Sequence, residues 1–189
     1  RVASIDLRKV LDSSINMASV EIKHRAQVIR EFGEIEPVAA NESRVGQVFL
    51  NMLVNAAQAF DDQVQGKNEI RVRTRMEHGS VVAEIEDTGG GIPRERLELI
   101  FDPFFTTKPL GQGTGLGLSI AQQIIHSFGG EIRVRSTVGQ GTTFTILLPP
   151  AERLDEAADL DSDSAPLVSR ARILLIDDDE DSFLVCRAH

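Results

Sequence analysis

The chain has 189 residues, of which 41% are hydrophobic and 26% charged, and its formal net charge is −9. This composition is that of a globular protein with one domain of about 150 residues and a remainder, and the 18 acidic and 16 basic side chains of residues 1–150 exclude the basic face that nucleic-acid binding requires. The single Cys186 excludes an internal disulfide, and without an apolar run of membrane-spanning length we expect a reducing, cytoplasmic compartment and no direct membrane contact in this segment.

The first sixty residues predict short strands and two helices. Residues 3–22 indicate a strand followed by a helix, because the apolar positions keep helical spacing. Two strand-sized runs follow at residues 26–33 and 37–41. The strongest helix covers about residues 43–60, and its apolar face consists of Val45, Val48, Phe49, Met52, Ala56 and Phe60.

The next ninety residues predict a sheet with further helices. Residues 69–76 and 80–87 alternate as two strands joined by a turn, with one buried face and one wet, arginine-bearing face. A short helix is expected over 92–100, with Pro93 at its start. The remaining predicted elements are a helix over 117–128 and strands over 131–136 and 142–149. This order predicts an α+β fold, a two-layer sandwich with helices on one face of a mixed, mostly antiparallel sheet.

Four amide side chains, Gln47, Asn51, Asn55 and Gln58, form a stripe on the helix predicted over 43–60. At 100° per residue they lie within about 80° of one another, and apolar residues flank them on both sides. The stripe is either an amide ladder that bonds to neighbouring backbone or the wall of a binding site. As a site wall it would offer Asn carbonyl oxygens, which are neutral, hard ligands suited to Mg²⁺.

Two glycine-rich segments are the strongest local features. In "EIEDTGGGIP" a strand ends at Asp87, and this is either an ordinary turn or a place where the carboxylate accepts from an exocyclic amino group. The second segment, "GQGTGLGLSI", matches neither the P-loop, because no Lys follows its glycines, nor the dinucleotide fingerprint. Glycine at this density is costly to order, so a ligand or another backbone must approach it closely.

Five segments in order identify a resemblance that covers about residues 1–150. Together they are similar to the N, G1, F, G2 and G3 boxes of the GHKL ATP-binding fold, in the version used by sensor histidine kinases. The resemblance implies that the glycine-rich run is the hinge of a flexible lid over ATP, whose backbone N–H groups face phosphates. The five segments are "NMLVNAAQAF", "EDTGGGIP", "IFDPFFTTK", "GQGTGLGL" and "GQGTTFTILLP".

The resemblance also implies which residues bind ATP and Mg²⁺. Asp87 would bind the adenine amino group with support from Thr142, and Asn55 would hold Mg²⁺ against the phosphates. Lys108 would contact phosphate, whereas Gln58 stands where many members carry a basic residue. The lid stem would be Phe104, Phe105, Thr106, Thr107 and Lys108. The full set of expected contacts is Asn51, Asn55, Asp87, Gly89, Gly91, Thr107, Lys108, Gly113, Thr114, Gly115, Leu116, Gly117 and Thr142.

Asn51 separates two activities within this fold. Members that hydrolyse ATP, such as DNA gyrase and heat-shock chaperones, have a Glu four residues before the Mg-binding Asn, and an amide cannot replace it as a general base. The resemblance therefore implies phosphoryl transfer to a histidine on a separate dimerisation domain. None of His24, His78, His126 and His189 has the sequence context of that histidine. The alternatives are a catalytically silent nucleotide-binding interaction module and, disfavoured by the tail, a serine kinase of the anti-sigma type.

The last 39 residues predict a linker and the beginning of a second domain. Residues 151–170 are acidic and rich in Ala and Ser, which is typical of a linker. The run "RILLIDDDED" is either a strand with a solvated acidic end or, by resemblance, the first strand of a response-regulator receiver, where Asp177 and Asp178 match an Mg²⁺-binding acid pair. We thus expect an ATP-binding domain at 1–150, a linker at 151–170 and an incomplete receiver at 171–189, excerpted from a bacterial hybrid kinase.

Overall fold

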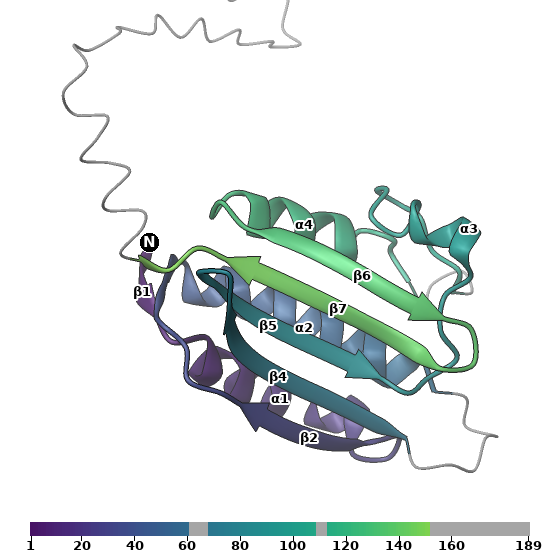
Figure 1. Ribbon diagram of the computed structural model, residues 1–189. Coiled ribbons are helices and arrows are strands. Elements are labelled where there is room, and N and C mark those ends of the chain that lie inside the picture. Colours follow the sequence, from purple (N-terminus) through teal and green to yellow (C-terminus); the bar gives the residue numbers. More distant parts are fainter. Residues whose placement is uncertain (61–67, 109–112, 152–189) are drawn as a thin grey trace, which may run out of the picture.

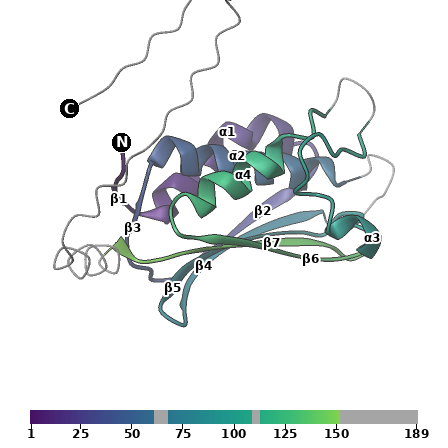
Figure 2. The same ribbon diagram turned by 90° about the horizontal axis from the view of Figure 1, so that it is seen from above.

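The computed structural model describes residues 1–60, 68–108 and 113–151, and they form a sheet layer and a helix layer (Figures 1 and 2). Helices α1, α2 and α4 lie over one face of a five-stranded sheet, and α3 lies near one end of it. The expected fold class is confirmed. The elements are β1 (Ala3–Ile5), α1 (Leu7–Ile22), β2 (Gln27–Phe32), β3 (Val38–Ala40), α2 (Glu42–Gln58), β4 (Glu69–Glu77), β5 (Ser80–Asp87), α3 (Arg94–Leu97), α4 (Gly117–His126), β6 (Glu131–Thr137) and β7 (Gly141–Leu148).

The sheet is mixed, and its strand order is β2-β4-β5-β7-β6. Only β2 and β4 pair in parallel, because the crossover through α2 connects them, and the other neighbours are antiparallel. The antiparallel register pairs Asp87 at the end of β5 with Thr142 in β7, and Thr142 with Ser136 in β6. These three positions therefore form one row across the sheet.

Local signals in the sequence fix where the two long helices begin. The Asp6 side chain accepts a hydrogen bond from the Arg8 N–H at 2.9 Å, and the Asn41 side chain accepts from the Arg44 N–H at 3.0 Å. Side chains of this kind satisfy N–H groups that have no partner inside the helix. Beyond these caps the apolar stripes of α1 and α2 pack on the sheet, and the expected face of α2 is fully in the core. No helix in the described part of the chain is both long and apolar enough to cross a membrane.

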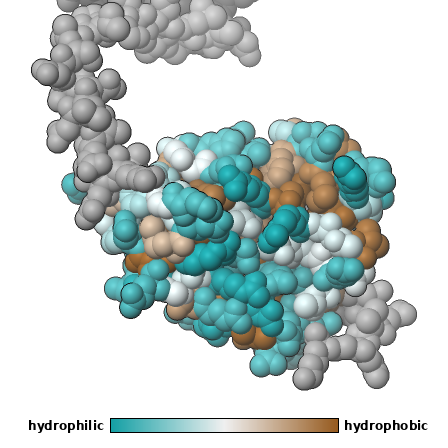
Figure 3. All heavy atoms as spheres, in the orientation of Figure 1, coloured by the Kyte–Doolittle hydropathy of each residue, from teal (hydrophilic) through white to brown (hydrophobic). Residues whose placement is uncertain are grey.

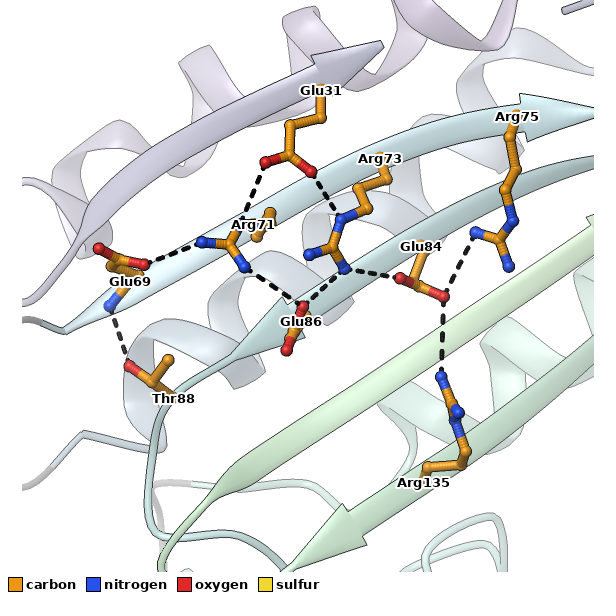
Figure 4. A network of polar contacts seen from close by, with 9 residues as sticks. All are labelled: Glu31, Glu69, Arg71, Arg73, Arg75, Glu84, Glu86, Thr88 and Arg135. Carbon is orange, nitrogen blue, oxygen red and sulfur yellow. Dashed lines mark hydrogen bonds and ion pairs between the residues drawn. The ribbon is translucent and has the colours of Figure 1, made fainter. Parts of the chain in front are cut away.

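The outer face of the sheet, opposite the helices, carries a network of ion pairs (Figure 4). Its centre is Glu84, whose side chain is only 7% exposed and lies 2.8 Å from Arg73, 3.4 Å from Arg75 and 4.0 Å from Arg135. Arg73 also contacts Glu86 at 2.6 Å. The space-filling view shows hydrophilic side chains gathered over β4 and β5 (Figure 3). The predicted arginine-bearing face exists, but its charges pair with one another rather than pointing freely into water.

Two elements differ from the sequence-based predictions. The helix expected over 92–100 is regular only at Arg94–Leu97. Beyond it the Arg96 carbonyl accepts from both the Leu99 N–H at 3.0 Å and the Ile100 N–H at 3.1 Å, so the last turn is mixed, and Ile100 is buried. The strand near residues 37–41 does form, as Val38–Ala40, but it pairs with β1 in a separate two-stranded sheet. Sequence periodicity identifies a strand and does not choose its partner.

Candidate functional site

A cavity of about 490 Å³ lies between α2, the end of β5, the segment that follows β5, and the start of α4. It brings together residues that are far apart in the sequence, and most of the expected contacts line it. Gly89 and Leu116 are the expected residues outside this lining, and Asp177 and Asp178 lie outside the described residues. The expected residues in the lining are Asn51, Asn55, Asp87, Gly91, Thr107, Lys108, Gly113, Thr114, Gly115, Gly117 and Thr142.

Asp87 is the buried carboxylate of this cavity, with only 4% of its surface exposed. Burial raises the pKa of Asp87 to about 6, although hydrogen bonds from the backbone of Gly89 and Thr142 act in the opposite direction. The Gly89 N–H donates to Oδ1 at 2.8 Å. A carboxylate needs donors when it is removed from water. The cavity floor is therefore suited to a ligand that brings an N–H group to Asp87.

The pKa of Asp87 gives a testable pH dependence. A ligand that donates to Asp87 requires the ionised form, so protonation competes with binding. Because the pKa is raised to about 6, ATP affinity should be constant near pH 8 and fall below pH 6, by up to about tenfold per pH unit. Calorimetric titration between pH 5 and 8 measures this. The phosphates of ATP titrate in the same range, so the Asp87→Asn variant serves as the reference, because its affinity should not depend on protonation at position 87. Identical profiles of affinity against pH for the two proteins would contradict the prediction.

Lys108 and the amide stripe meet at the α2 wall of the cavity. The Lys108 ammonium donates to Asn55 Oδ1 at 3.1 Å and to Gln58 Oε1. Burial lowers the pKa of Lys108. Asn51, Asn55 and Gln58 line this cavity, whereas Gln47 lines a smaller one between α2 and α4. The stripe therefore lines the cavity over three of its four positions, and Gln58 contacts a lysine.

The beginning of α4 closes the cavity beside the amide wall. A Cβ atom on Gly117 would lie only 2.4 Å from Asn51 Nδ2, so a larger residue there would force the Asn51 side chain to move. The helix has no side-chain cap hydrogen bond at Leu116, and Gly115 and Gly117 line the cavity. Unpaired N–H groups and the helix dipole make such an N-terminus favourable for anions. The close approach predicted for the glycine-rich run is thus made in part by Asn51.

The two phenylalanines of the expected lid stem take different positions. Phe105 lines the cavity. Phe104 is 75% exposed, and its backbone lies in the left-handed region at φ 69°, held by a hydrogen bond from its N–H to the Gly115 carbonyl at 2.9 Å. Sequence reasoning did not single out several lining residues. The apolar ones could have been found as hydrophobic positions beside the motifs, and the remaining one is a cation without a distinguishing pattern. The apolar residues are Val54, Ala59, Ile92, Ile100, Leu118 and Phe144, and the cation is Arg96.

The fold and the cavity agree with one protein family. Residues 40–152 match the family described as histidine kinase-, DNA gyrase B-, and HSP90-like ATPase. The chain belongs to this family, and its domain is of the kind found in sensor histidine kinases.

Particular relatives specify the branch of the family. The chain is 39% identical over 170 residues to the sensor kinase CckA of Brucella abortus, covering 78% of this chain and 18% of that protein. It is 40% identical over 142 residues to the signal transduction histidine-protein kinase AtoS of Escherichia coli, covering 74% of this chain and 22% of AtoS. The chain thus matches about a fifth of the length of these relatives.

Solved structures of histidine kinases have the same fold. The catalytic domain of the histidine kinase ThkA has a TM-score of 0.69 at 29% identity, and the match covers 81% of this chain and 98% of that domain. Full-length ShkA, solved in complex with AMPPNP, has a TM-score of 0.69 at 25% identity, and the match covers 79% of this chain and 31% of ShkA.

Proposed function

We propose that this chain binds Mg²⁺-ATP in the cavity and transfers the γ-phosphoryl group to a histidine on a separate dimerisation domain. The observation that carries the proposal is the buried carboxylate of Asp87 in a cavity whose lining also includes Lys108 and the N-terminus of α4. A ligand that carries both a hydrogen-bond donor and negative charge fits this lining. The family of the chain and the AMPPNP complex of ShkA support a nucleotide as that ligand.

Adenine would occupy the end of the cavity at Asp87. The carboxylate accepts from the 6-amino group, and the apolar side chains of Ile92, Ile100 and Phe144 in the lining supply surface against which the ring packs. Thr142 lies in register beside Asp87 and is only 4% exposed. The base is thus recognised by a few buried polar groups on an otherwise apolar wall.

The phosphates would lie between the amide wall and α4. Lys108 supplies a positive charge, and the N–H groups of Gly115 and Gly117 donate to phosphate oxygens. Asn55 Oδ1 fits a hard cation, because it faces the cavity and already accepts a hydrogen bond from an ammonium group. Mg²⁺ held there would neutralise phosphate charge. Lys108 must then move from Asn55 toward the phosphates, which its long side chain permits.

The Asn55→Ala variant tests this assignment. Removing the amide oxygen should lower Mg²⁺-ATP affinity about tenfold or more, as for a lost hydrogen bond to a charged group. Titrations with Mg²⁺ and with a chelator should then give the same affinity, whereas the unaltered chain should bind more tightly with Mg²⁺. Gln47→Ala is the matched control, because Gln47 lies on the same helix outside this cavity. A Mg²⁺ dependence that persists in Asn55→Ala would place the metal elsewhere.

Transfer rather than hydrolysis follows from Asn51. Hydrolysis would need a general base beside the γ-phosphate, and the amide of Asn51, which lines the cavity, cannot take a proton. In transfer, the imidazole nitrogen is itself the nucleophile. It bonds to the γ-phosphorus while the bond to the bridging oxygen breaks, and ADP leaves. The work of the chain is to position ATP and stabilise its charge.

Calorimetry and labelling together test the proposed function. Saturable one-site binding of ATP with Mg²⁺ is expected for the full chain, and no binding would overturn the proposal. Radiolabelled ATP and a dimerisation domain supplied in trans then separate transfer from the alternative of a catalytically silent binding module. Label on the histidine of that domain supports transfer, whereas ATP binding without label supports the silent module.

We further propose that residues 1–150 are the ATP-binding domain, 151–170 a linker and 171–189 the beginning of a receiver domain. The charge pattern supports this division, because residues 151–189 carry 11 acidic and 4 basic side chains whereas 1–150 are nearly balanced. In a receiver, Asp177 and Asp178 would contribute to an Mg²⁺ site. The parent protein would then be a hybrid kinase whose partners include a receiver.

A further inference from the structure

Ser136 lies just behind the cavity, beside two residues that line it. In the sheet register it is the neighbour of Thr142, which is in turn the neighbour of Asp87, so the three share one face of the sheet. Ser136 is not part of the cavity lining. Its hydroxyl oxygen lies 2.9 Å from the Gly141 carbonyl, 2.7 Å from the Ile92 nitrogen and 2.9 Å from Thr142 Oγ1.

These three contacts determine the direction of each hydrogen bond. A hydroxyl group has one proton to donate and two lone pairs to accept with. The Gly141 carbonyl can only accept, so it takes the Ser136 proton, and the Ile92 N–H can only donate. The bond between the two hydroxyl groups must therefore be donated by Thr142. The reverse direction would leave the Ser136 and Gly141 oxygens facing each other at 2.9 Å without a proton between them.

The proton of Thr142 is thus committed to Ser136, on the side away from the cavity. Toward the cavity, Thr142 presents only lone pairs, as does the ionised carboxylate of Asp87 beside it. The floor of the cavity then accepts hydrogen bonds and donates none from these two side chains. The 6-amino group of adenine donates to such a floor, whereas a 6-oxo group places an acceptor against acceptors.

We propose that Ser136 is a positioning residue that sets nucleobase specificity by fixing Thr142 as a hydrogen-bond acceptor. The inference rests on the proposed function, because it requires the base to lie at Asp87. Without the Ser136 hydroxyl, Thr142 is free to rotate and donate into the cavity. The site then tolerates a 6-oxo purine better, even though Ser136 touches no ligand.

The ratio of ATP to ITP affinity tests this role, since ITP differs from ATP by a 6-oxo group and a proton on N1. If Ser136 had only a structural role, through its bond to the Ile92 N–H, its loss would weaken the binding of both nucleotides equally and leave the ratio of their affinities unchanged. Ser136→Ala should lower the preference for ATP about two- to tenfold, the range expected for one neutral hydrogen bond. Ser136→Thr keeps the hydroxyl and should keep the preference of the unaltered chain.

The experiment is a calorimetric titration of each nucleotide, with Mg²⁺, into the full chain and its variants. Ser127→Ala is the matched control, because its hydroxyl donates to the Ile124 carbonyl at the end of α4, away from the base. Ser136→Cys, whose thiol is a weaker donor and acceptor than the hydroxyl, replaces Ser136→Ala if the latter does not fold, and a lower ratio than in the unaltered chain is again expected. If Ser136→Ala and Ser136→Cys bind ATP with the same ratio of ATP to ITP affinity as the unaltered chain, the inference is overturned and the proposed function still stands. No ATP binding by the unaltered chain overturns both.

Discussion

Replacing Asp87 by Asn is expected to weaken ATP binding about 10- to 160-fold, which corresponds to about 1.5–3 kcal/mol for a lost hydrogen bond to a charged group. The carboxylate is 4% exposed and is the group to which we assign the adenine amino group. The fold should not suffer, because burial disfavours the charge that the substitution removes. Calorimetry at pH 8, where Asp87 is ionised, measures the affinity, and urea unfolding measures the stability.

Glu86→Gln is the matched control for this variant. This variant makes the same change from carboxylate to amide one position earlier in the chain. The Glu86 side chain, however, points to the outer face and pairs with Arg73. We expect ATP affinity close to that of the unaltered chain. An Asp87→Asn variant that binds ATP as tightly as Glu86→Gln would remove Asp87 from the nucleotide site.

Gly141→Ala should be strongly destabilising, by about 2–4 kcal/mol. The φ angle of Gly141 is 109°, in the region that L-residues avoid, and a Cβ atom there would lie 1.8 Å from the carbonyl oxygen of Asp87. Both atoms at the clash belong to paired strands, so neither can move without opening β5 from β7. The free energy of unfolding in urea measures the effect, and ATP affinity should fall with it.

Gly139→Ala separates backbone strain from the clash. Gly139 also has a positive φ, 79°, but nothing lies within 4 Å of the position that its Cβ would take. The free energy of unfolding of Gly139→Ala should fall only by the cost of the left-handed conformation, about 1–2 kcal/mol. If Gly141→Ala lowers the free energy of unfolding no more than Gly139→Ala does, the close contact between Gly141 and Asp87 does not constrain the fold.

Periodicity and turn signals predicted most of the fold. The apolar face of α2, from Val45 to Ala56, was recognisable because burial on one side imposes a 3.6-residue period. The hairpin of β4 and β5 followed from alternation around the turn at His78–Gly79, where both φ angles are positive. The pairing of β3 with β1 could not be predicted, because partner choice depends on contacts between residues distant in the sequence.

The candidate site was predicted where short motifs carry its residues. Asp87 and the glycines near α4 belong to such motifs, and the cavity brings them together. The contact of Lys108 with Gln58 joins segments fifty residues apart, and no motif describes it. Ser136 was missed for a different reason. It acts through Thr142, so neither its type nor its spacing marks it as functional, and only the register of β6 against β7 places it there.

The outer face of the sheet has a consequence for how other proteins can approach. Its guanidinium and carboxylate groups are already engaged across β2, β4, β5 and β6. A protein that docked there would have to displace water and break these pairs, while meeting little net charge to attract it. This face therefore exerts little electrostatic attraction on a partner protein. Under the proposed function, we expect encounters with a histidine-bearing domain to occur from the helical side or over the cavity, whose lining includes Lys108 and Arg96.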